Sequence, residues 1–195
     1  EVPARADVVV LAVNPAALVA VAPQVQAAKE IVSVLAATPL ARLRGALPEA
    51  KILRTMPNVG VEVRQGVICI AGDDPSPAVA AALEQIAHVV AIEEDDFDGA
   101  TAVMGGAPAY LALAVEAIAD AGAAGGRVPE LARELIVGTT AGTAELLRRR
   151  HPADVRRAVA SPGGSTEAGL EALDRAGARD AFTAAVVASL GRMRG

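Results

Sequence analysis

The strongest constraint on the fold is a change of pattern part-way along the chain, from short β-branched runs to long alanine-rich stretches. Up to about residue 93, apolar runs of strand length alternate with segments of helical periodicity. This alternation is typical of a parallel sheet covered by helices on both faces. The expected strands cover residues 8–13, 31–35, 51–54, 67–71 and 89–92, and the expected helices between them cover residues 16–29, 40–47 and 77–87.

From about residue 95 the strand pattern stops and alanine-rich helical stretches follow one another. The sequence is 53% hydrophobic but only 2% aromatic, so its core rests on small side chains that favour helices. The expected helices cover residues 98–121, 129–150, 166–176 and 180–194. We therefore predict a fold that is α/β over residues 1–93 and all-α over residues 94–195.

Charge and cysteine content exclude several classes of function. The formal net charge is −5, and the Lys and Arg residues are scattered, so the basic stripe of a nucleic-acid binder is absent. Cys69 is the only cysteine, which excludes an internal disulfide and a cysteine-rich metal site. The sequence shows no signal segment and no uninterrupted apolar stretch of membrane-spanning length. These observations predict a soluble cytoplasmic protein without a metal centre.

The expected sheet lacks one feature that dinucleotide-binding sheets normally carry. Such a sheet opens with a strand, a turn of the form G-x-G-x-x-G and a helix whose N-terminus holds the pyrophosphate. No such turn follows any expected strand here. We therefore expect that at least one βαβ unit, of roughly 30 residues, is missing from the chain. On local pattern alone, a compact α/β fold that never had this turn remains an alternative.

Four segments resemble, in chain order, the motifs of one enzyme family. Residues 6–15 (ADVVVLAVNP) are similar to a strand and loop that end in AVKP, and residues 54–58 (RTMPN) to R-x-MPN. Residues 105–110 (GGAPAY) resemble GSGPAY, and residues 160–166 (ASPGGST) resemble the signature SPGGTT. The family is that of the pyrroline-5-carboxylate reductases, and the resemblance covers essentially the whole chain.

The resemblance implies a Rossmann-like domain that binds NADPH or NADH, incomplete here at its N-terminal end. It also implies a helical C-terminal domain that binds substrate and forms a homodimer, often within a larger ring. The active site would lie between the cofactor domain and the helical dimer. The implied reaction is hydride transfer from the nicotinamide to the C=N carbon of 1-pyrroline-5-carboxylate, a cyclic imino acid, which gives proline.

The segment at residues 161–166 has a physical rationale of its own. Gly163 and Gly164 allow a sharp turn that exposes N–H groups, and Ser165 and Thr166 open a helix whose first amides lack intrahelical partners. Such a helix end favours an anion, so we assign these amides and the Ser161 hydroxyl to the substrate carboxylate. By resemblance, the Thr166 hydroxyl is catalytic and lies near the ring nitrogen. In isolation, such a segment is a plain loop and helix cap.

Three segments that follow expected strands are candidates for the cofactor site. Ligands bind at the carboxyl edge of a parallel sheet, where these segments are expected to lie. By resemblance, they line the nicotinamide half of the cofactor site. The residues are Ala12, Val13, Asn14, Pro15, Ala36, Ala37, Met56, Pro57 and Asn58.

Some residues depart from the family pattern, which leaves alternatives open. Asn14 stands where the family usually has Lys, and Glu167 occupies a position that is usually apolar and lies beside the expected carboxylate site. The alternatives are a reductase of another cyclic imine and a non-catalytic paralogue that acts as a dimerisation or interaction protein.

Overall fold

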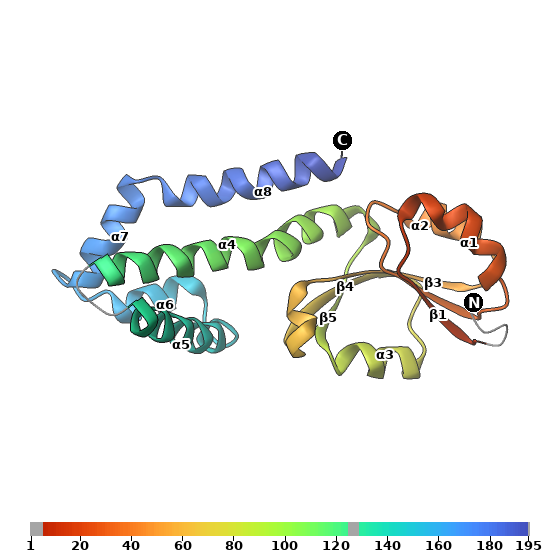
Figure 1. Cartoon of the computed structure of the whole chain (residues 1–195), viewed down its shortest axis with the longest axis horizontal. Helices are drawn as coiled ribbons and strands as arrows, with labels where there is room; N and C mark the ends of the chain where they lie inside the picture. The colour runs from red at the N-terminus through yellow and green to blue at the C-terminus, as the bar shows by residue number, and fades with distance from the viewer. Residues whose placement is uncertain (1–5, 125–128, 195) are drawn as a thin grey trace. The chain divides into compact units, whose positions relative to one another are not determined.

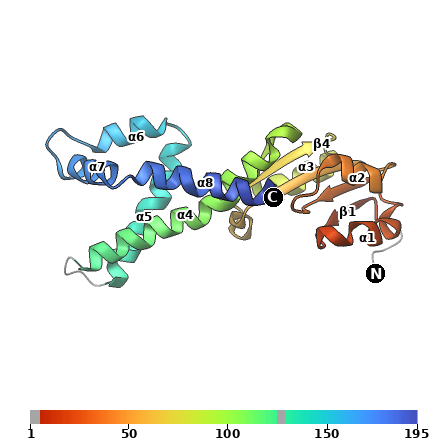
Figure 2. The same cartoon turned by 90° about the horizontal axis from the view of Figure 1, so that it is seen from above.

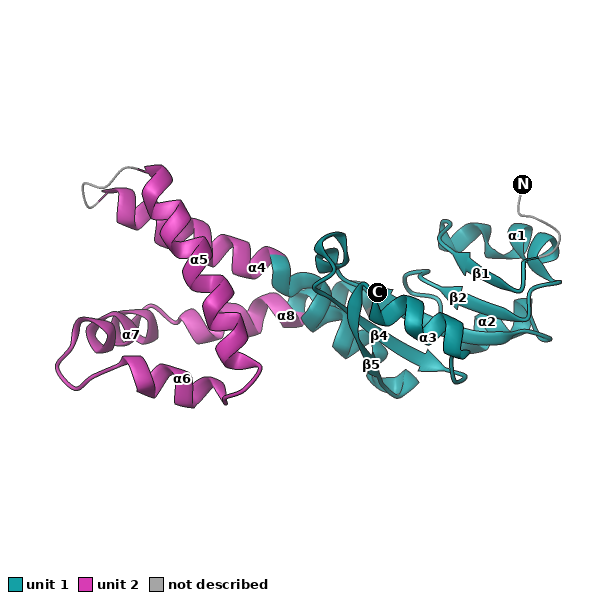
Figure 3. Ribbon diagram, turned by 90° about the horizontal axis from the view of Figure 1, so that it is seen from below, with its two compact units in different colours: residues 1–108, 188–195 teal, residues 109–187 magenta. Residues whose placement is uncertain are grey.

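The computed structural model describes residues 6–124 and 129–194. The chain divides into two compact units, which are distinguished by colour in Figure 3. The first unit comprises residues 1–108 and 188–195, and the second comprises residues 109–187. We describe each unit by itself.

The first unit is built on a five-stranded sheet in the order β1-β2-β3-β4-β5. The strands β1, β2 and β3 run parallel, and so do β4 and β5, but β4 is antiparallel to β3. The strands are β1 (Val8–Leu11), β2 (Glu30–Ser33), β3 (Lys51–Pro57), β4 (Gly66–Gly72) and β5 (Ala87–Ala91).

The antiparallel pair corrects the expectation of a fully parallel sheet. The chain between β3 and β4 covers residues 58–65 and contains only the short 3₁₀ helix η2 (Val59–Val63). A parallel connection needs a crossover of roughly a dozen residues or more, so this length permits only reversal of direction. The α/β character of the first half is confirmed.

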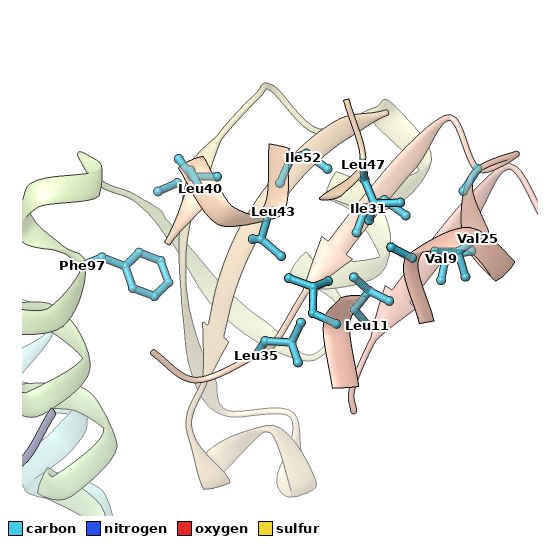
Figure 4. Packing of buried hydrophobic residues seen from close by; sticks show 14 of the residues in the cluster. Val9, Leu11, Val25, Ile31, Leu35, Leu40, Leu43, Leu47, Ile52 and Phe97 are labelled. Carbon is cyan, nitrogen blue, oxygen red and sulfur yellow. The ribbon is translucent and has the colours of Figure 1, made fainter. Parts of the chain in front are cut away.

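Three helices cover the sheet, with α1 (Leu18–Val25) and α2 (Leu40–Ala46) on one face and α3 (Pro77–Glu84) on the other (Figure 1). The helix expected over residues 16–29 is shorter, because the 3₁₀ helix η1 (Pro15–Ala17) precedes α1. Leu18 of α1 and Leu43 of α2 are fully buried against Ile52 of β3. Burial of each such side chain contributes about 1.5–3 kcal/mol. Figure 4 shows these helices and strands pointing their apolar side chains into one layer.

Helices alone form the remainder of the described chain, as expected, and they can be followed in Figure 2. Phe97, in the first turn of α4, is buried in the same core as the sheet (Figure 4). The helices are η3 (Glu94–Asp96), α4 (Phe97–Ala124), α5 (Pro129–Leu147), α6 (Pro152–Val159), α7 (Ser165–Arg175) and α8 (Ala178–Arg194).

The second unit has almost no core of its own. Among its described residues only Ala132 is buried, while many large apolar side chains are exposed, such as Leu113 at 65% and Phe182 at 50%. Tyr110, Leu113 and Phe182 line an apolar hollow of about 430 Å³ between α4, α7 and α8. An apolar surface of this extent marks a site of association rather than a solvated face.

The helix Glu94–Ala124 corrects one expectation about apolar stretches. By length and composition, this helix is long and apolar enough to cross a membrane. Only 6% of its most apolar segment is buried within the protein. An apolar helix that is covered by another protein chain meets the same criteria. Residues 109–124 of this helix belong to the second unit and add to its exposed apolar side chains.

Candidate cofactor edge and substrate loop

The predicted cofactor segments meet at one edge of the sheet, which we call the cofactor edge. The three parallel strands pair in register, so that Leu11, Ser33 and Arg54 lie in one row. The residues Asn14, Ala36 and Pro57 each lie three positions beyond this row. Because the strands point the same way, their ends and the segments that follow them lie at the same edge. Strand β3 extends to Pro57, so Met56 and Pro57 lie within it and not after it as expected. The structure thus brings together residues from all three predicted segments, Ala12–Pro15, Ala36–Ala37 and Met56–Asn58.

The loop after β1 is held by a side-chain cap. The Asn14 Oδ1 atom accepts a hydrogen bond from the Ala16 N–H at 3.0 Å, and Pro15 begins η1. The Arg42 guanidinium donates to the Pro15 carbonyl at 3.4 Å, which brings a cation to this edge. Sequence reasoning missed Arg42, because 27 residues separate the two partners and no local pattern joins them.

The loop after β2 contains a strained residue. Ala37 has a φ of 48°, in the left-handed region that L-residues other than glycine rarely adopt. The next residue, Thr38, is fully buried and donates its hydroxyl hydrogen to the Ala36 carbonyl at 3.0 Å. Strained backbone persists where the surroundings hold it, and it concentrates at functional sites.

The segment after β3 is fixed by the Asn58 side chain. Its Oδ1 atom accepts from the Gly60 N–H at 3.2 Å and from the Val67 N–H at 3.0 Å, which closes the η2 loop. Its Nδ2 atom donates to the Met104 carbonyl of α4 at 3.3 Å. Met56 and Pro57, at the end of β3, are therefore held against both the η2 loop and α4.

Arg54 lies at the centre of a buried cluster of charged side chains. From the sequence, Arg54 was placed in a motif but given no role. Its guanidinium donates to Glu94 at 2.8 Å and to Asp98 at 3.3 Å, and lies 3.9 Å from the centroid of the Phe97 ring. The same Glu94 oxygen accepts from the Leu40 N–H at 2.9 Å. An Arg with a side chain only 6% exposed needs such partners, because an unpaired buried charge is costly. The cluster anchors the start of α4 to β3 and α2.

The predicted substrate segment forms an exposed loop in the second unit, which we call the substrate loop (residues 161–166). The Gly164 N–H donates to the Ser161 carbonyl at 2.9 Å, and Gly163 has a φ of 72° that suits glycine. Helix α7 begins at Ser165, with Gly164 as its N-cap. The N–H groups of Ser165 and Thr166 therefore lie in a first helical turn, where no intrahelical acceptor is available.

One amide of the substrate loop already holds a carboxylate of the chain itself. The Glu167 Oε2 atom accepts from the Gly163 N–H at 2.7 Å, and both groups are exposed. A charged acceptor makes a stronger hydrogen bond than a neutral one. This arrangement demonstrates that the loop presents an N–H in a position that a carboxylate can reach.

The segment at residues 105–110 lies within α4, which continues through Pro108. Pro108 has no N–H, so the Met104 carbonyl four residues earlier lacks its usual helical donor. The Tyr110 hydroxyl donates to the Ala185 carbonyl of α8 at 3.4 Å. This segment therefore shapes α4 and joins two helices of the second unit.

Neither a reactive thiol nor a metal cluster accompanies these groups. Cys69 is buried in the sheet, and burial raises the pKa of its thiol, which keeps it protonated and unreactive. Among the residues that the structure describes, no group of three His, Cys, Asp or Glu side chains is placed to hold a metal ion.

A known family profile, described as "Pyrroline-5-carboxylate reductase dimerisation", matches residues 94–195. A pyrroline-5-carboxylate reductase from Thermus thermophilus is 37% identical over 194 residues, which cover 96% of this chain and 74% of that protein. The chain belongs to the pyrroline-5-carboxylate reductase family. A reductase of the same name from Synechocystis is 37% identical over 169 residues, covering 83% of this chain and 63% of that protein.

Solved structures of the same family share the fold. A pyrroline-5-carboxylate reductase from Coxiella burnetii superposes with a TM-score of 0.87 at 26% identity, covering 98% of this chain and 76% of the other. The Plasmodium falciparum pyrroline carboxylate reductase, solved with NADP bound, superposes with a TM-score of 0.85 at 26% identity. The match covers 96% of this chain and 76% of the other. The predicted family and fold class are confirmed, while the domain boundary at residue 93 and the roles of the site residues remain predictions.

Proposed function

We propose that this chain acts in the NAD(P)H-dependent reduction of 1-pyrroline-5-carboxylate to proline. The proposal rests on relatives that are named for this reaction and align with both the sheet and the helices of this chain. The alignment with the Thermus thermophilus enzyme covers 96% of this chain. The chain spans 63% of the Synechocystis relative and about three quarters of several others, such as 74% of the Arabidopsis thaliana reductase. Residues 1–93 then serve as the cofactor domain, and residues 94–195 as the dimerisation and substrate domain.

The cofactor is NADPH or NADH, and the cofactor edge receives its nicotinamide half. The solved relative with NADP bound supports this choice. The strand-end segments offer backbone groups and small side chains, at Ala12-Val13, Ala36-Ala37 and Met56-Pro57-Asn58, against which a flat ring can pack. Arg42 adds positive charge beside Pro15, where the cap residue Asn14 carries none.

The substrate loop binds the carboxylate of the cyclic imine. The amides of Ser165 and Thr166 follow a glycine turn at a helix N-terminus, and both features favour an anion. The Gly164 amide, which was assigned to the carboxylate with them, already donates to the Ser161 carbonyl at 2.9 Å. The Ser161 hydroxyl supplies a further donor, and the Gly163 N–H already donates to a carboxylate, that of Glu167. The Thr166 hydroxyl lies near the ring nitrogen in this arrangement.

The reaction needs positioning more than acid–base machinery. When bound, the reduced nicotinamide would supply the hydride that adds to the imine carbon. The electrons of the C=N π bond would then move to the ring nitrogen, whose proton gives the amine of proline. Because an imine is readily protonated, the protein contributes mainly orientation and a bound carboxylate. This requirement fits the assigned site residues, none of which is a histidine.

The helical unit forms a homodimer, which assembles with further dimers into a ring. The near absence of a core and the exposed side chains of α4, α7 and α8 support a partner of the same kind. The dimerisation profile that matches residues 94–195 supports the same conclusion. We place the protein in the cytoplasm, where its cofactors are available.

The function is tested by NAD(P)H oxidation, with and without 1-pyrroline-5-carboxylate, on the natural protein that contains this chain. Thr166→Val keeps the shape of the side chain and removes its hydroxyl, so kcat is expected to fall by about 10- to 100-fold. Thr166→Ser restores the hydroxyl and is expected to recover most of the activity. Full activity in Thr166→Val contradicts the assigned role, and a folded wild type inactive with both nucleotides contradicts the function.

A further inference from the structure

An open backbone acceptor lies inside α4. In a regular helix, the Met104 carbonyl accepts from the N–H of residue 108, but Pro108 has none. The carbonyl is partly buried, where an unsatisfied acceptor costs about 1–3 kcal/mol. The Asn58 Nδ2 atom donates to this oxygen at 3.3 Å. Asn58, from the motif at residues 54–58, thus donates to the carbonyl that Pro108, from the motif at residues 105–110, leaves without a helical donor. The two bonded residues are 46 positions apart in the sequence.

Asn58 uses both ends of its carboxamide within the protein. Its Oδ1 atom accepts from two backbone N–H groups that close the η2 loop, those of Gly60 and Val67. Its Nδ2 atom reaches α4. A carboxamide places an acceptor for two donors and a separate donor on different atoms, which lets it reach two parts of the chain at once. Asp has no donor, and Gln is longer by one methylene group.

The η2 loop cannot readily adjust to replace this contact. A Cβ atom on Gly66 would lie 2.5 Å from Val61 Cγ1, and one on Gly60 would lie 3.2 Å from Asn58 Oδ1. Atoms packed this closely leave the loop little room to move as it follows β3. The distance between the end of β3 and α4 is therefore set at the Asn58 side chain.

We propose that Asn58 is a positioning residue, which holds the Met56-Pro57 segment of the cofactor edge against α4 through the carbonyl that Pro108 leaves open. Its effect on the reaction is indirect, because both ends of its side chain are engaged by the protein. The Arg54 cluster anchors the middle of β3 to the start of α4, and Asn58, which follows the strand, anchors its end. The effect on turnover rests on the proposed reductase function.

A double-mutant cycle between residues 58 and 108 tests this proposal. Asn58→Asp keeps the acceptor and removes the donor. Pro108→Ala gives the Met104 carbonyl a helical partner and so removes the open acceptor. Each single variant of the natural protein is expected to lower kcat by about 10-fold or more, since small displacements in an active site are costly. The double variant is expected to be no slower than the slower single variant.

The division between kcat and KM separates positioning from direct binding. A positioning role lowers kcat and leaves the KM for NADPH within about threefold of the wild type. Independent effects that multiply in the double variant would overturn the proposal. So would a higher KM for NADPH with an unchanged kcat in Asn58→Asp, because that result marks a direct cofactor ligand.

A matched control and a second readout keep the two proposals separable. Gln24→Glu makes the same change of amide to carboxylate at an exposed position of α1. Gln24 Nε2 also donates to a backbone carbonyl, at 3.3 Å. This control is expected to leave kcat unchanged. The same cycle is measured by urea unfolding, which needs no turnover. Coupling in unfolding with an inactive wild type supports the contact and overturns the reductase function. Additive unfolding energies overturn the contact itself.

Discussion

At the scale of single residues, the substrate loop combines a conformational requirement with an electrostatic one. Gly163 adopts a positive φ, and its N–H faces outward to the Glu167 carboxylate. A substrate carboxylate directed to the same loop meets this negative charge. Under the proposed function, Glu167 competes with the substrate carboxylate for a donor and repels it, and we therefore expect this side chain to limit affinity.

Glu167→Gln is expected to lower the KM for 1-pyrroline-5-carboxylate by about 3- to 10-fold, because a neutral amide neither repels the substrate nor holds the Gly163 N–H as strongly. The change in kcat is expected to be small, since Glu167 has no part in hydride transfer. Steady-state kinetics at varied imine concentration measure both constants. Glu171→Gln, one turn further along exposed α7, is the control for lost charge. An unchanged or higher KM in Glu167→Gln would refute the competition.

At the scale of elements, the hairpin-like pairing of β3 with β4 depends on one glycine. Gly72, at the end of β4, has a φ of 112°, and a Cβ atom there would lie 2.3 Å from the Ile52 carbonyl oxygen. The next residue, Asp73, accepts from the Ile52 N–H at 2.7 Å, and this bond together with Arg44 lowers the pKa of the Asp73 carboxyl. The end of β4 is therefore fixed closely against β3.

Gly72→Ala is expected to lower the free energy of unfolding by about 2–4 kcal/mol, since the new methyl group clashes with backbone and the φ is strained. Gly45→Ala is the matched control, because its Cβ atom meets nothing within 4 Å in helix α2. That change is expected to raise the free energy by about 0.5–1 kcal/mol. Urea unfolding measures both, and equal stabilities for the two variants would contradict the geometry.

Local pattern predicted the elements well and their long-range contacts poorly. The β-branched runs predicted at residues 8–13 and 31–35 gave strands, which end earlier than expected, at Leu11 and Ser33. Residue type alone predicts such strands, although Val8 and Val10 of the first are exposed. The direction of β4 was missed because it depends on the length of the connection from β3. That the three strand-end segments share one edge could be predicted for the same reason as the strands themselves, while their role in binding remains a prediction. The contact of Asn58 with Met104 spans 46 residues, and no periodicity signals it.

At the scale of the whole molecule, the two units differ in how far they bury their apolar side chains. The sheet and its helices enclose a core that includes Leu18, Leu43 and Ile52. The described part of the helical unit buries Ala132 alone. A second chain that covers these exposed side chains would bury them, in agreement with the dimerisation profile that matches residues 94–195.

Leu113→Lys is expected to dissociate the dimer, because a charge replaces an apolar side chain that is 65% exposed in the single chain. Val19→Lys, at a position that is 72% exposed on α1, is the control and is expected to leave the dimer intact. Analytical ultracentrifugation gives the mass of each variant, and circular dichroism verifies that each remains helical. A wild type that sediments as a monomer, or a Leu113→Lys variant that remains dimeric, would contradict this assignment of the interface.

The central claim is that the protein transfers a hydride from a reduced nicotinamide to the carbon of a cyclic imine. The most direct measurement uses NADPH or NADH with deuterium at the transferred position of the nicotinamide, 1-pyrroline-5-carboxylate, and mass spectrometry of the product. The account predicts proline that carries one deuterium at the former imine carbon, formed in step with nucleotide oxidation. Folded protein that yields no labelled proline with either nucleotide would contradict it.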